Sequence, residues 1–274
     1  MRIPRPWATD VAVLRLGGSV VEAHPDHLVL ASPHNPGFHW GNLVLVTDPQ
    51  RADDAMHWVE RFDEHFPDAE HVSIGLPRAP VAGRYEAVGL AVEPELVLVS
   101  GAAPPARPCP QGFVVRPLAH DGEWAQAVAL DVALAGPAAA GQGSGERRYC
   151  ERQWRTRQGL AARGEAAFLA AFAADGQLAS VLGIVLCGPL DDARQVARYQ
   201  HVVTAPQHRG RGLASHLLHA AGAWAAQRGA DVWEIHVDPG SPAHRLYDHL
   251  GFRELGVLWQ AGRAPGSDDP TSAR

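Results

Sequence analysis

Residues 199–224 read YQHVVTAPQHRGRGLASHLLHAAGAW and are the most informative part of the chain. The stretch begins as a strand, which we expect to end at Pro206 because proline has no backbone N–H to donate to a neighbouring strand. Gly210 and Gly212 then lead into a helix. The apolar stripe of that helix consists of Leu213, Leu217, Ala221 and Trp224. A strand, a glycine loop and a helix in this order predict a ligand-binding turn.

The loop between this strand and this helix is suited to an anion. Glycine lets the backbone approach a ligand closely, and the first N–H groups of a helix point outward at the positive end of its dipole. Arg209 and Arg211 add positive charge. A Walker loop is excluded because it needs a lysine and the chain has none, and a Rossmann loop needs a third glycine that is missing here. We therefore predict a pyrophosphate cradle that belongs to neither class.

Residues 241–252, SPAHRLYDHLGF, predict a second, short helix downstream of the loop. Ser241 can cap its N-terminus, Pro242 suits the first helical position, and Gly251 suits the residue after its end. Expected strands and helices alternate from residue 113 to residue 259, whereas strands dominate before residue 100. The sequence therefore predicts an α/β fold with a mixed sheet.

The proline- and glycine-rich segment GAAPPARPCPQG, residues 101–112, is the clearest domain boundary. The two sides of this boundary are related by a weak repeat, because Tyr85 and Gly89 recur as Tyr247 and Gly251 at an offset of 162 residues. The expected organisation is an accessory domain over 1–100, a linker over 101–112, a catalytic domain over 113–261 and a disordered tail over 262–274.

Composition excludes several classes of partner. The net charge is −6, and residues 1–100 hold 7 Arg against 14 acidic residues, so the chain lacks the basic surface that nucleic acids require. No apolar run approaches the ~18 residues of a membrane-spanning helix. The cysteines, Cys109, Cys150 and Cys187, form no C-x-x-C pair, as in proteins of a reducing compartment. We expect a cytoplasmic protein with no nucleic-acid or membrane partner.

Two motifs resemble those of the GNAT N-acetyltransferase superfamily. That family binds coenzyme A through Q/R-x-x-G-x-G/A, and RGRGLA at 209–214 matches it. The second family motif is A-x-x-L-Y-x-x-x-G-F, which matches Ala243, Leu246, Tyr247, Gly251 and Phe252. The resemblance covers the C-terminal half and implies a tandem form, in which the C-terminal GNAT-like domain is complete. The N-terminal one is degenerate, because its loop carries Asp48, Asp53 and Asp54 in place of glycines and would repel a pyrophosphate.

The resemblance implies that acetyl-CoA is the co-substrate and that an amine accepts its acetyl group. Tyr247 is the implied general acid for the departing thiolate. The general base stays open between His201, Glu234, His236 and a chain of water molecules. The implied acetyl-CoA residues are Val202, Val203, Thr204, Arg209, Gly210, Arg211, Gly212, Leu213, Ala214 and Ser215.

The expected function is therefore direct N-acetylation of a primary amine. We favour a small molecule as acceptor because an acidic accessory domain suits a cationic amine. The alternatives are a non-catalytic acyl-CoA-binding regulatory module, or acetylation of a protein N-terminus or lysine; a homodimer is left open. Two H-x-x-H pairs, His24–His27 and His216–His219, have a spacing that is common in proteins, and we predict no metal site.

Overall fold

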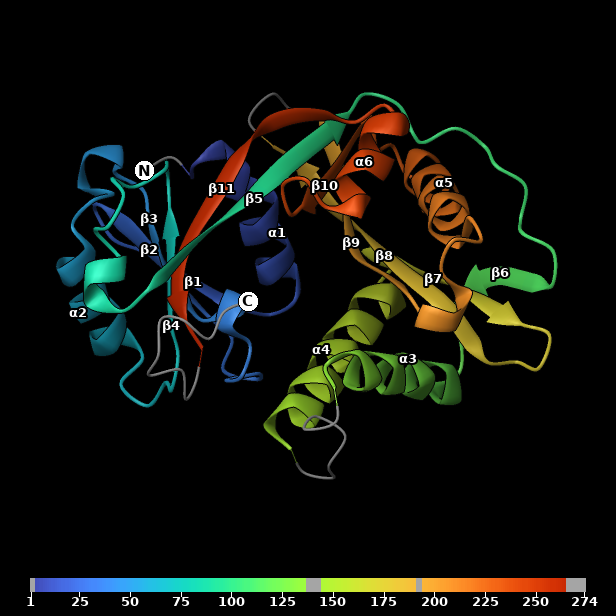
Figure 1. The fold of residues 1–274 in the computed structure, drawn as a ribbon, viewed down its shortest axis with the longest axis horizontal. Helices are drawn as coiled ribbons and strands as arrows, with labels where there is room; N and C mark the ends of the chain where they lie inside the picture. The colour runs from blue at the N-terminus through green and yellow to red at the C-terminus, as the bar shows by residue number, and fades with distance from the viewer. Residues whose placement is uncertain (1–2, 137–143, 191–193, 265–274) are drawn as a thin grey trace. The chain divides into compact units, whose positions relative to one another are not determined.

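The computed structural model describes residues 3–136, 144–190 and 194–264. These residues divide by their contacts into two compact units (Figure 1). The first holds the chain up to residue 97 with 237–239 and the residues from 255 onward, and the second holds 98–236 and 240–254. The predicted α/β class with a mixed sheet is confirmed, because parallel and antiparallel strand pairs occur in both units.

The first unit has helices on both faces of its sheet. Its elements are α1 (Ala8–Leu16), β1 (Val20–Ala23), β2 (His27–Ala31), β3 (Leu43–Val46), α2 (Ala55–His65), β4 (Val72–Leu76), β5 (Ala91–Ser100) and β11 (Arg253–Arg263). The strand order is β1-β2-β3-β4-β11-β5. Alternate side chains of a strand point to opposite faces. Accordingly Leu45 belongs to the buried cluster of Val11 on α1, and Val44 to that of Trp58 on α2.

The last strand, β11, lies in the first unit from residue 255 onward. It pairs antiparallel with β4 from Trp259↔Leu76 to Arg263↔Val72, and Leu258 is buried in the cluster of α1. The expected ranges 113–261 and 262–274 are therefore corrected, because residues 255–263 complete the first sheet. Apolar periodicity identifies a strand but not the sheet that buries it. Residues 265–274 of the expected tail lie outside the described residues.

The second unit is a sheet in the order β10-β9-β8-β7-β6. Helix α5 covers one face, and α3 and α4 cover the other (Figure 1). Its elements are β6 (Phe113–Pro117), α3 (Asp121–Leu134), α4 (Gly145–Ala162), β7 (Ala166–Ala173), β8 (Leu178–Pro189), β9 (Gln195–Thr204), α5 (Leu213–Ala226), β10 (Val232–Val237) and α6 (Pro242–His249).

The proline-rich segment 101–112 contains no helix or strand and belongs to the second unit. Two histidines of α5 hold it in place. His219 Nδ1 donates to the carbonyl of Pro104 at 2.8 Å, and His216 Nδ1 donates to that of Arg107 at 2.7 Å. The H-x-x-H pair of α5 therefore fixes this segment on the helix.

The weak sequence repeat corresponds to a repeat of structure, seen separately in each unit. In the first, β1 to β3 pair antiparallel in turn and β3 is parallel to β4. The second repeats this pattern with β7, β8, β9 and β10. The residue after the repeated glycine donates its amide to the carbonyl of Tyr85 at 3.0 Å and of Tyr247 at 3.1 Å. Gly89 and Gly251 share the left-handed conformation, with φ of 76° and 94°.

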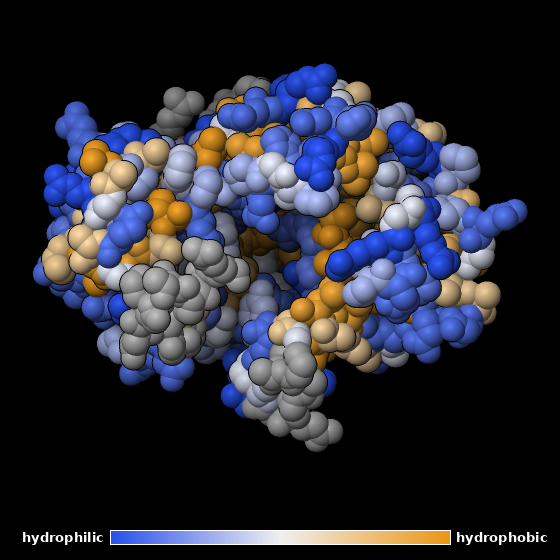
Figure 2. Space-filling view, in the orientation of Figure 1, coloured by the Kyte–Doolittle hydropathy of each residue, from blue (hydrophilic) through white to orange (hydrophobic). Residues whose placement is uncertain are grey.

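The described surface mixes hydrophilic and hydrophobic residues, as one face shows in Figure 2. None of the helices in the described ranges combines the length and hydrophobicity needed to cross a bilayer. The large hydrophobic side chains exposed in these ranges are Val20, Trp40, Met56, Val81, Val114, Leu134 and Leu255. One of them, Leu134 at the end of α3, also lines the pocket of the second unit.

Candidate active site

Two parallel strands stop pairing midway along the second unit's sheet. β9 and β10 pair from Val232↔Val196 to Glu234↔Arg198. β9 nevertheless continues to Thr204, and its residues from 202 to 204 line a pocket. β8 pairs with one side of β9 as far as Thr204, but on the side that faces β10 the described strands leave the backbone groups beyond Arg198 without a partner, so they are available to a ligand. The end of β9 can therefore present N–H groups to a bound molecule.

β9 also carries a bulge where this free section begins. Val181 of β8 pairs with Val203, whereas Gly183 pairs with Gln200, so β9 holds one extra residue over this step. His201 lies in the extra section with φ of 54° and is the one non-glycine residue of the described chain with a positive φ. Bulges re-aim backbone groups near functional sites. The next residue, Val202, is the first β9 residue in the pocket.

The glycine loop leaves room for a ligand at the start of α5. Gly210 and Gly212 have φ of 73° and 80°, a conformation that side-chain-bearing residues rarely adopt. A Cβ built on either glycine meets no heavy atom within 4 Å, so the space beside the loop is open. Arg209 borders this space, and its Nε donates to the carbonyl of Thr204 at 3.2 Å. Helix α5 is 14 residues long and begins at Leu213 with its first N–H groups directed toward the loop.

A pocket of about 520 Å³ joins these features. It contains all ten of the residues that the sequence assigns to acetyl-CoA, together with Tyr247. The pocket is also lined by five residues that were not predicted as site residues, which are Leu134, His208, Pro242, Ala243 and Leu246. Ala243 and Leu246 belong to the second motif, and His208 and Pro242 neighbour predicted positions. Leu134 lies far away in the sequence, and no local pattern indicates it.

Tyr247 is placed by a helix whose ends the sequence specifies. The Ser241 side chain accepts the amide of His244 at 3.2 Å, and Pro242 occupies the first helical position, as predicted. The Tyr247 ring is buried, with 4% of the residue exposed. Burial raises the pKa of Tyr247 to about 12, although the charge of Arg198 opposes the rise. The phenol is therefore protonated at neutral pH and lies at the pocket as a proton donor.

His201 is held in a buried network instead of lining the pocket. Its Nε2 donates to Asp131 Oδ1 at 2.8 Å, and its Nδ1 lies 3.3 Å from an amino group of Arg157, which donates to it. The indole of Trp154 donates to Asp131 Oδ2 at 2.7 Å. Burial, and then the charge of Arg157, lower the pKa of His201, while the bond to Asp131 opposes this shift. Both imidazole nitrogens are thus engaged, and the ring is neutral.

Asp131 anchors this network from α3. Burial alone would raise the pKa of its carboxyl, but the hydrogen bonds from His201 and Trp154 and the charge of Arg157 bring the pKa below its usual value. Neither Asp131 nor Arg157 lies in a motif, and neither was among the predicted site residues. Their distance from His201 along the chain does not indicate a contact, because only the packing of α3 and α4 on the sheet brings the three residues together.

Glu234 and His236, the other candidate bases, form a buried pair on β10. His236 Nε2 lies 3.1 Å from Glu234 Oε1, and their side chains are 2% and 0% exposed. Neither belongs to the lining of the pocket that contains Tyr247. The structure therefore brings Tyr247 and the expected acetyl-CoA residues together, and places His201, Glu234 and His236 outside that lining.

The equivalent loop of the first unit is occupied by its own side chains. Asp53 accepts from Arg78 at 2.6 Å and from the amide of Val81, also at 2.6 Å. These bonds lower the pKa of Asp53, which keeps the carboxylate charged. Asp48 caps the short 3₁₀ turn that follows it. Negative charge at this position disfavours a pyrophosphate, in keeping with the predicted degenerate loop.

Comparison with known proteins agrees with this geometry. Residues 137–252 match the model of the acetyltransferase (GNAT) family. No curated protein matches the chain. This stretch lies in the second unit except for residues 237–239, and it includes all of the pocket residues but Leu134.

Solved structures of low sequence identity share the fold over nearly the whole chain. A GCN5-related N-acetyltransferase from Kribbella flavida is 16% identical, with a TM-score of 0.61 and an alignment that covers 95% of this chain and 96% of that one. A tandem GNAT protein from the clavulanic acid biosynthesis pathway is 17% identical, with a TM-score of 0.57 and coverage of 98% and 91%. A protein of unknown function from Staphylococcus epidermidis is 12% identical, with a TM-score of 0.63 and coverage of 88% and 92%. The fold of the chain is similar to that of this tandem GNAT protein, and the family model matches only the C-terminal part of the chain.

The match of residues 137–252 to this family implies acyl transfer from acetyl-CoA. The residues of the pocket fit such a donor. The open cradle beside Gly210 and Gly212 suits a pyrophosphate, and the free end of β9 suits a thioester carbonyl.

Proposed function

We propose that the second unit transfers the acetyl group of acetyl-CoA directly to a primary amine of a small molecule. The observation that carries this proposal is the single pocket in which the glycine loop, the free end of β9 and the Tyr247 phenol meet. Bound acetyl-CoA supplies a thioester carbon that the amine nitrogen can attack. The residues of the chain then have three tasks, which are to hold the donor, stabilise the oxyanion and protonate the leaving group.

Charge develops on the carbonyl oxygen during the attack. A preorganised hydrogen-bond donor at that oxygen contributes roughly 3 kcal/mol. We assign this task to backbone N–H groups of the bulged section of β9, from Val202 to Thr204. The pyrophosphate is held by the first N–H groups of α5, with Arg209 and Arg211 beside it.

Tyr247 completes the reaction. The new C–N bond forms as the C–S bond breaks, and the phenol gives its proton to the departing sulfur. Its pKa of about 12 keeps that proton in place at neutral pH. The amine loses its own proton to water in the pocket. His201 is assigned a positioning role, because its Nε2–H faces Asp131 and its Nδ1 accepts from Arg157.

A cationic acceptor is favoured by the charge of the chain. Residues 1–100 carry 14 acidic residues against 7 Arg, and a negative field concentrates cationic amines near the molecule. The charge therefore indicates a cationic class of acceptor, and a screen of amines would identify the molecule.

The test is thiol release from acetyl-CoA in the presence of polyamines, aminoglycosides, amino acids and short peptides. The chain has no lysine, so it has no side-chain ammonium group that acetyl-CoA could acetylate as background. We expect turnover with at least one small amine. Tyr247→Phe should lower kcat ~100-fold while leaving the affinity for CoA unchanged. Tyr149→Phe is the matched control and should retain activity, because Tyr149 is a partly buried tyrosine of α4 outside the pocket lining.

Two results would contradict the proposal. CoA binding with no turnover for any amine would favour a regulatory acyl-CoA-binding module. Turnover with peptides bearing a free N-terminus or a lysine, and with no small amine, would place the acceptor in the protein class.

A further inference from the structure

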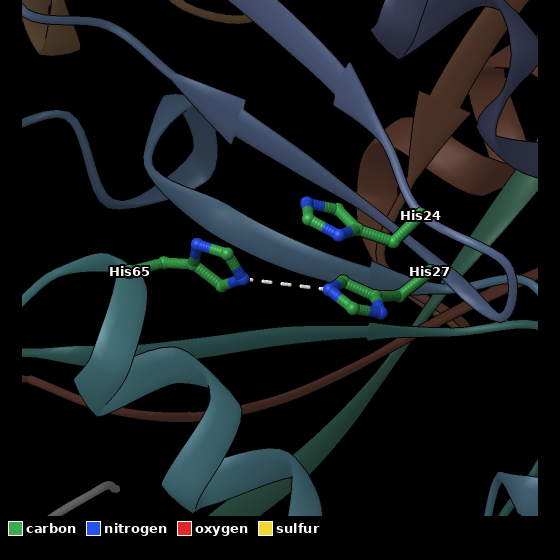
Figure 3. Close-up of side chains that lie close together, drawn as sticks. All are labelled: His24, His27 and His65. Carbon is green, nitrogen blue, oxygen red and sulfur yellow. Dashed lines mark hydrogen bonds between the residues drawn. The ribbon is translucent and has the colours of Figure 1, made fainter.

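The first unit brings three imidazole rings together at one end of its sheet (Figure 3). His24 follows β1, His27 begins β2, and His65 ends α2. One ring nitrogen from each lies within 4.8 Å of the other two. The common H-x-x-H spacing of His24 and His27 predicts no metal site. His65 is 38 residues further along the chain from His27 and joins the pair only in the folded structure.

A neighbouring carboxylate orients the central ring. His27 Nδ1 donates to Asp26 Oδ1 at 2.8 Å, which leaves the lone pair of His27 on Nε2, the nitrogen that faces His65 Nε2. Asp26 is in turn paired with Arg51. Metal-binding histidines commonly donate their second nitrogen to a carboxylate in this way, which fixes the tautomer and the direction of the ring.

The spacing of the nitrogen atoms fits a small metal ion. His27 Nε2 and His65 Nε2 face each other at 3.5 Å (Figure 3). Two nitrogen ligands at ~2.05 Å from a tetrahedral zinc ion lie ~3.4 Å apart. The rings of His24 and His27 are stacked, with 4.4 Å between their centroids and 2° between their planes, so His24 must rotate its ring for its lone pair to point at the same ion. Its side chain is only partly buried, at 26% exposure, and this leaves room for the adjustment.

The surrounding charges favour a dication. Glu22 Oε1 lies 3.1 Å from His24 Nε2, and its exposed side chain can reach the ion or leave the fourth position to water. Asp54 bonds to Arg51 at 3.2 Å and adds a third carboxylate to those of Glu22 and Asp26. Arg51 is the basic residue paired with two of them, so the described charges near the three rings are predominantly negative.

We propose that His24, His27 and His65 form a binding site for one divalent transition-metal ion of the zinc class. Imidazole ligands suit zinc, nickel and copper, whereas magnesium and calcium prefer oxygen ligands. The bound ion fastens the β1–β2 hairpin to the C-terminal end of α2. The site consists of residues of the first unit and does not depend on the proposed acetyl transfer, since none of the three lines the pocket.

The test uses the full chain without a histidine tag, stripped with EDTA and titrated with Zn²⁺ by calorimetry. We expect one ion per chain. At a Zn²⁺ concentration 100-fold above Kd, Tm should rise by about 5 °C, and Mg²⁺ should leave it unchanged. His24→Gln and His65→Gln should each weaken Zn²⁺ binding at least 10-fold. Asp26→Asn should weaken it ~10-fold through the orientation of His27.

His34→Gln is the matched control, because His34 is an exposed histidine of the same unit. It should bind Zn²⁺ like the wild type. Circular dichroism in EDTA shows whether each variant folds, and His24→Gln serves as the second variant if His65→Gln does not fold. Absence of Zn²⁺ binding, or binding that His24→Gln and His65→Gln leave unaltered, would overturn the proposal.

Discussion

His201 and Asp131 are joined by a 2.8 Å hydrogen bond between Nε2 and Oδ1 at the bulge of β9, directly before the residues of β9 that line the pocket. His201 has two properties that experiments can separate. Its backbone adopts a left-handed φ of 54°, and its side chain fills both hydrogen-bonding positions with Asp131 and Arg157. The backbone leads into Val202, the first residue of β9 that lines the pocket, and the side chain connects β9 to Asp131 of α3 and Arg157 of α4.

The backbone role predicts different outcomes for two substitutions of His201. Asparagine tolerates positive φ, whereas valine does not, and the left-handed conformation costs a residue with a Cβ about 1–2 kcal/mol. His201→Asn should therefore keep the affinity for CoA within ~3-fold of the wild type. His201→Val should lower both that affinity and the free energy of unfolding by more. Calorimetric CoA titration and urea unfolding would measure both effects, and equal behaviour of the two variants would show that the bulge is irrelevant.

The side-chain role predicts a dependence of stability on pH. The pKa of His201 is lowered in the folded state, so as pH falls below ~6.5 the unfolded chain takes up this proton first. The stabilisation is fully present above pH ~6.5 and is lost as pH falls toward the folded pKa. His201→Asn should reduce the slope of unfolding free energy against pH by up to ~1.4 kcal/mol per pH unit. Urea unfolding between pH 7 and 5 would measure it, and an unchanged slope would contradict the network.

The two arginines of the glycine loop should contribute to binding through charge. Arg209→Gln and Arg211→Gln are each expected to weaken CoA binding about 3- to 10-fold at low salt and less at high salt, because ions screen exposed charges. Arg228→Gln is the matched control, since Arg228 stacks on Trp224 at the other end of α5. Titrations at two salt concentrations would test this. A loss of equal size for Arg228→Gln would point to a general charge effect.

The placement of β11 predicts that a residue near the C-terminus stabilises the first unit. Leu258 is 0% exposed in the cluster of Val11, and its replacement by alanine should cost about 2–5 kcal/mol. Leu255→Ala, on the same strand but 40% exposed, should cost within ~0.5 kcal/mol. Urea unfolding followed by circular dichroism would compare them. Similar costs for both would mean that β11 does not pack as described.

Sequence patterns predicted those parts of the site that depend on neighbours along the chain. The glycine loop, the caps of α6 and the position of Tyr247 follow from residues within one turn or motif. The environment of His201, a candidate base, could not be predicted in this way. Nothing near His201 in the sequence indicates that its ring nitrogens bond to Asp131 and Arg157. The partner sheet of β11 and the meeting of His65 with His27 depend likewise on long-range packing. Apolar periodicity indicates which side of a helix or strand is buried, but it does not indicate which other element packs against that side.

The measurement closest to the central claim is a calorimetric titration of the full chain with CoA, repeated on two substitutions of Gly210. Aspartate and asparagine have nearly the same shape and both tolerate the left-handed φ of 73°, so the two variants differ mainly in charge. We predict one CoA site per wild-type chain, modest weakening in Gly210→Asn, and at least 10-fold weaker binding in Gly210→Asp than in Gly210→Asn. No binding to the wild type, or equal affinities for the two variants, would contradict the assignment of this loop as a pyrophosphate cradle.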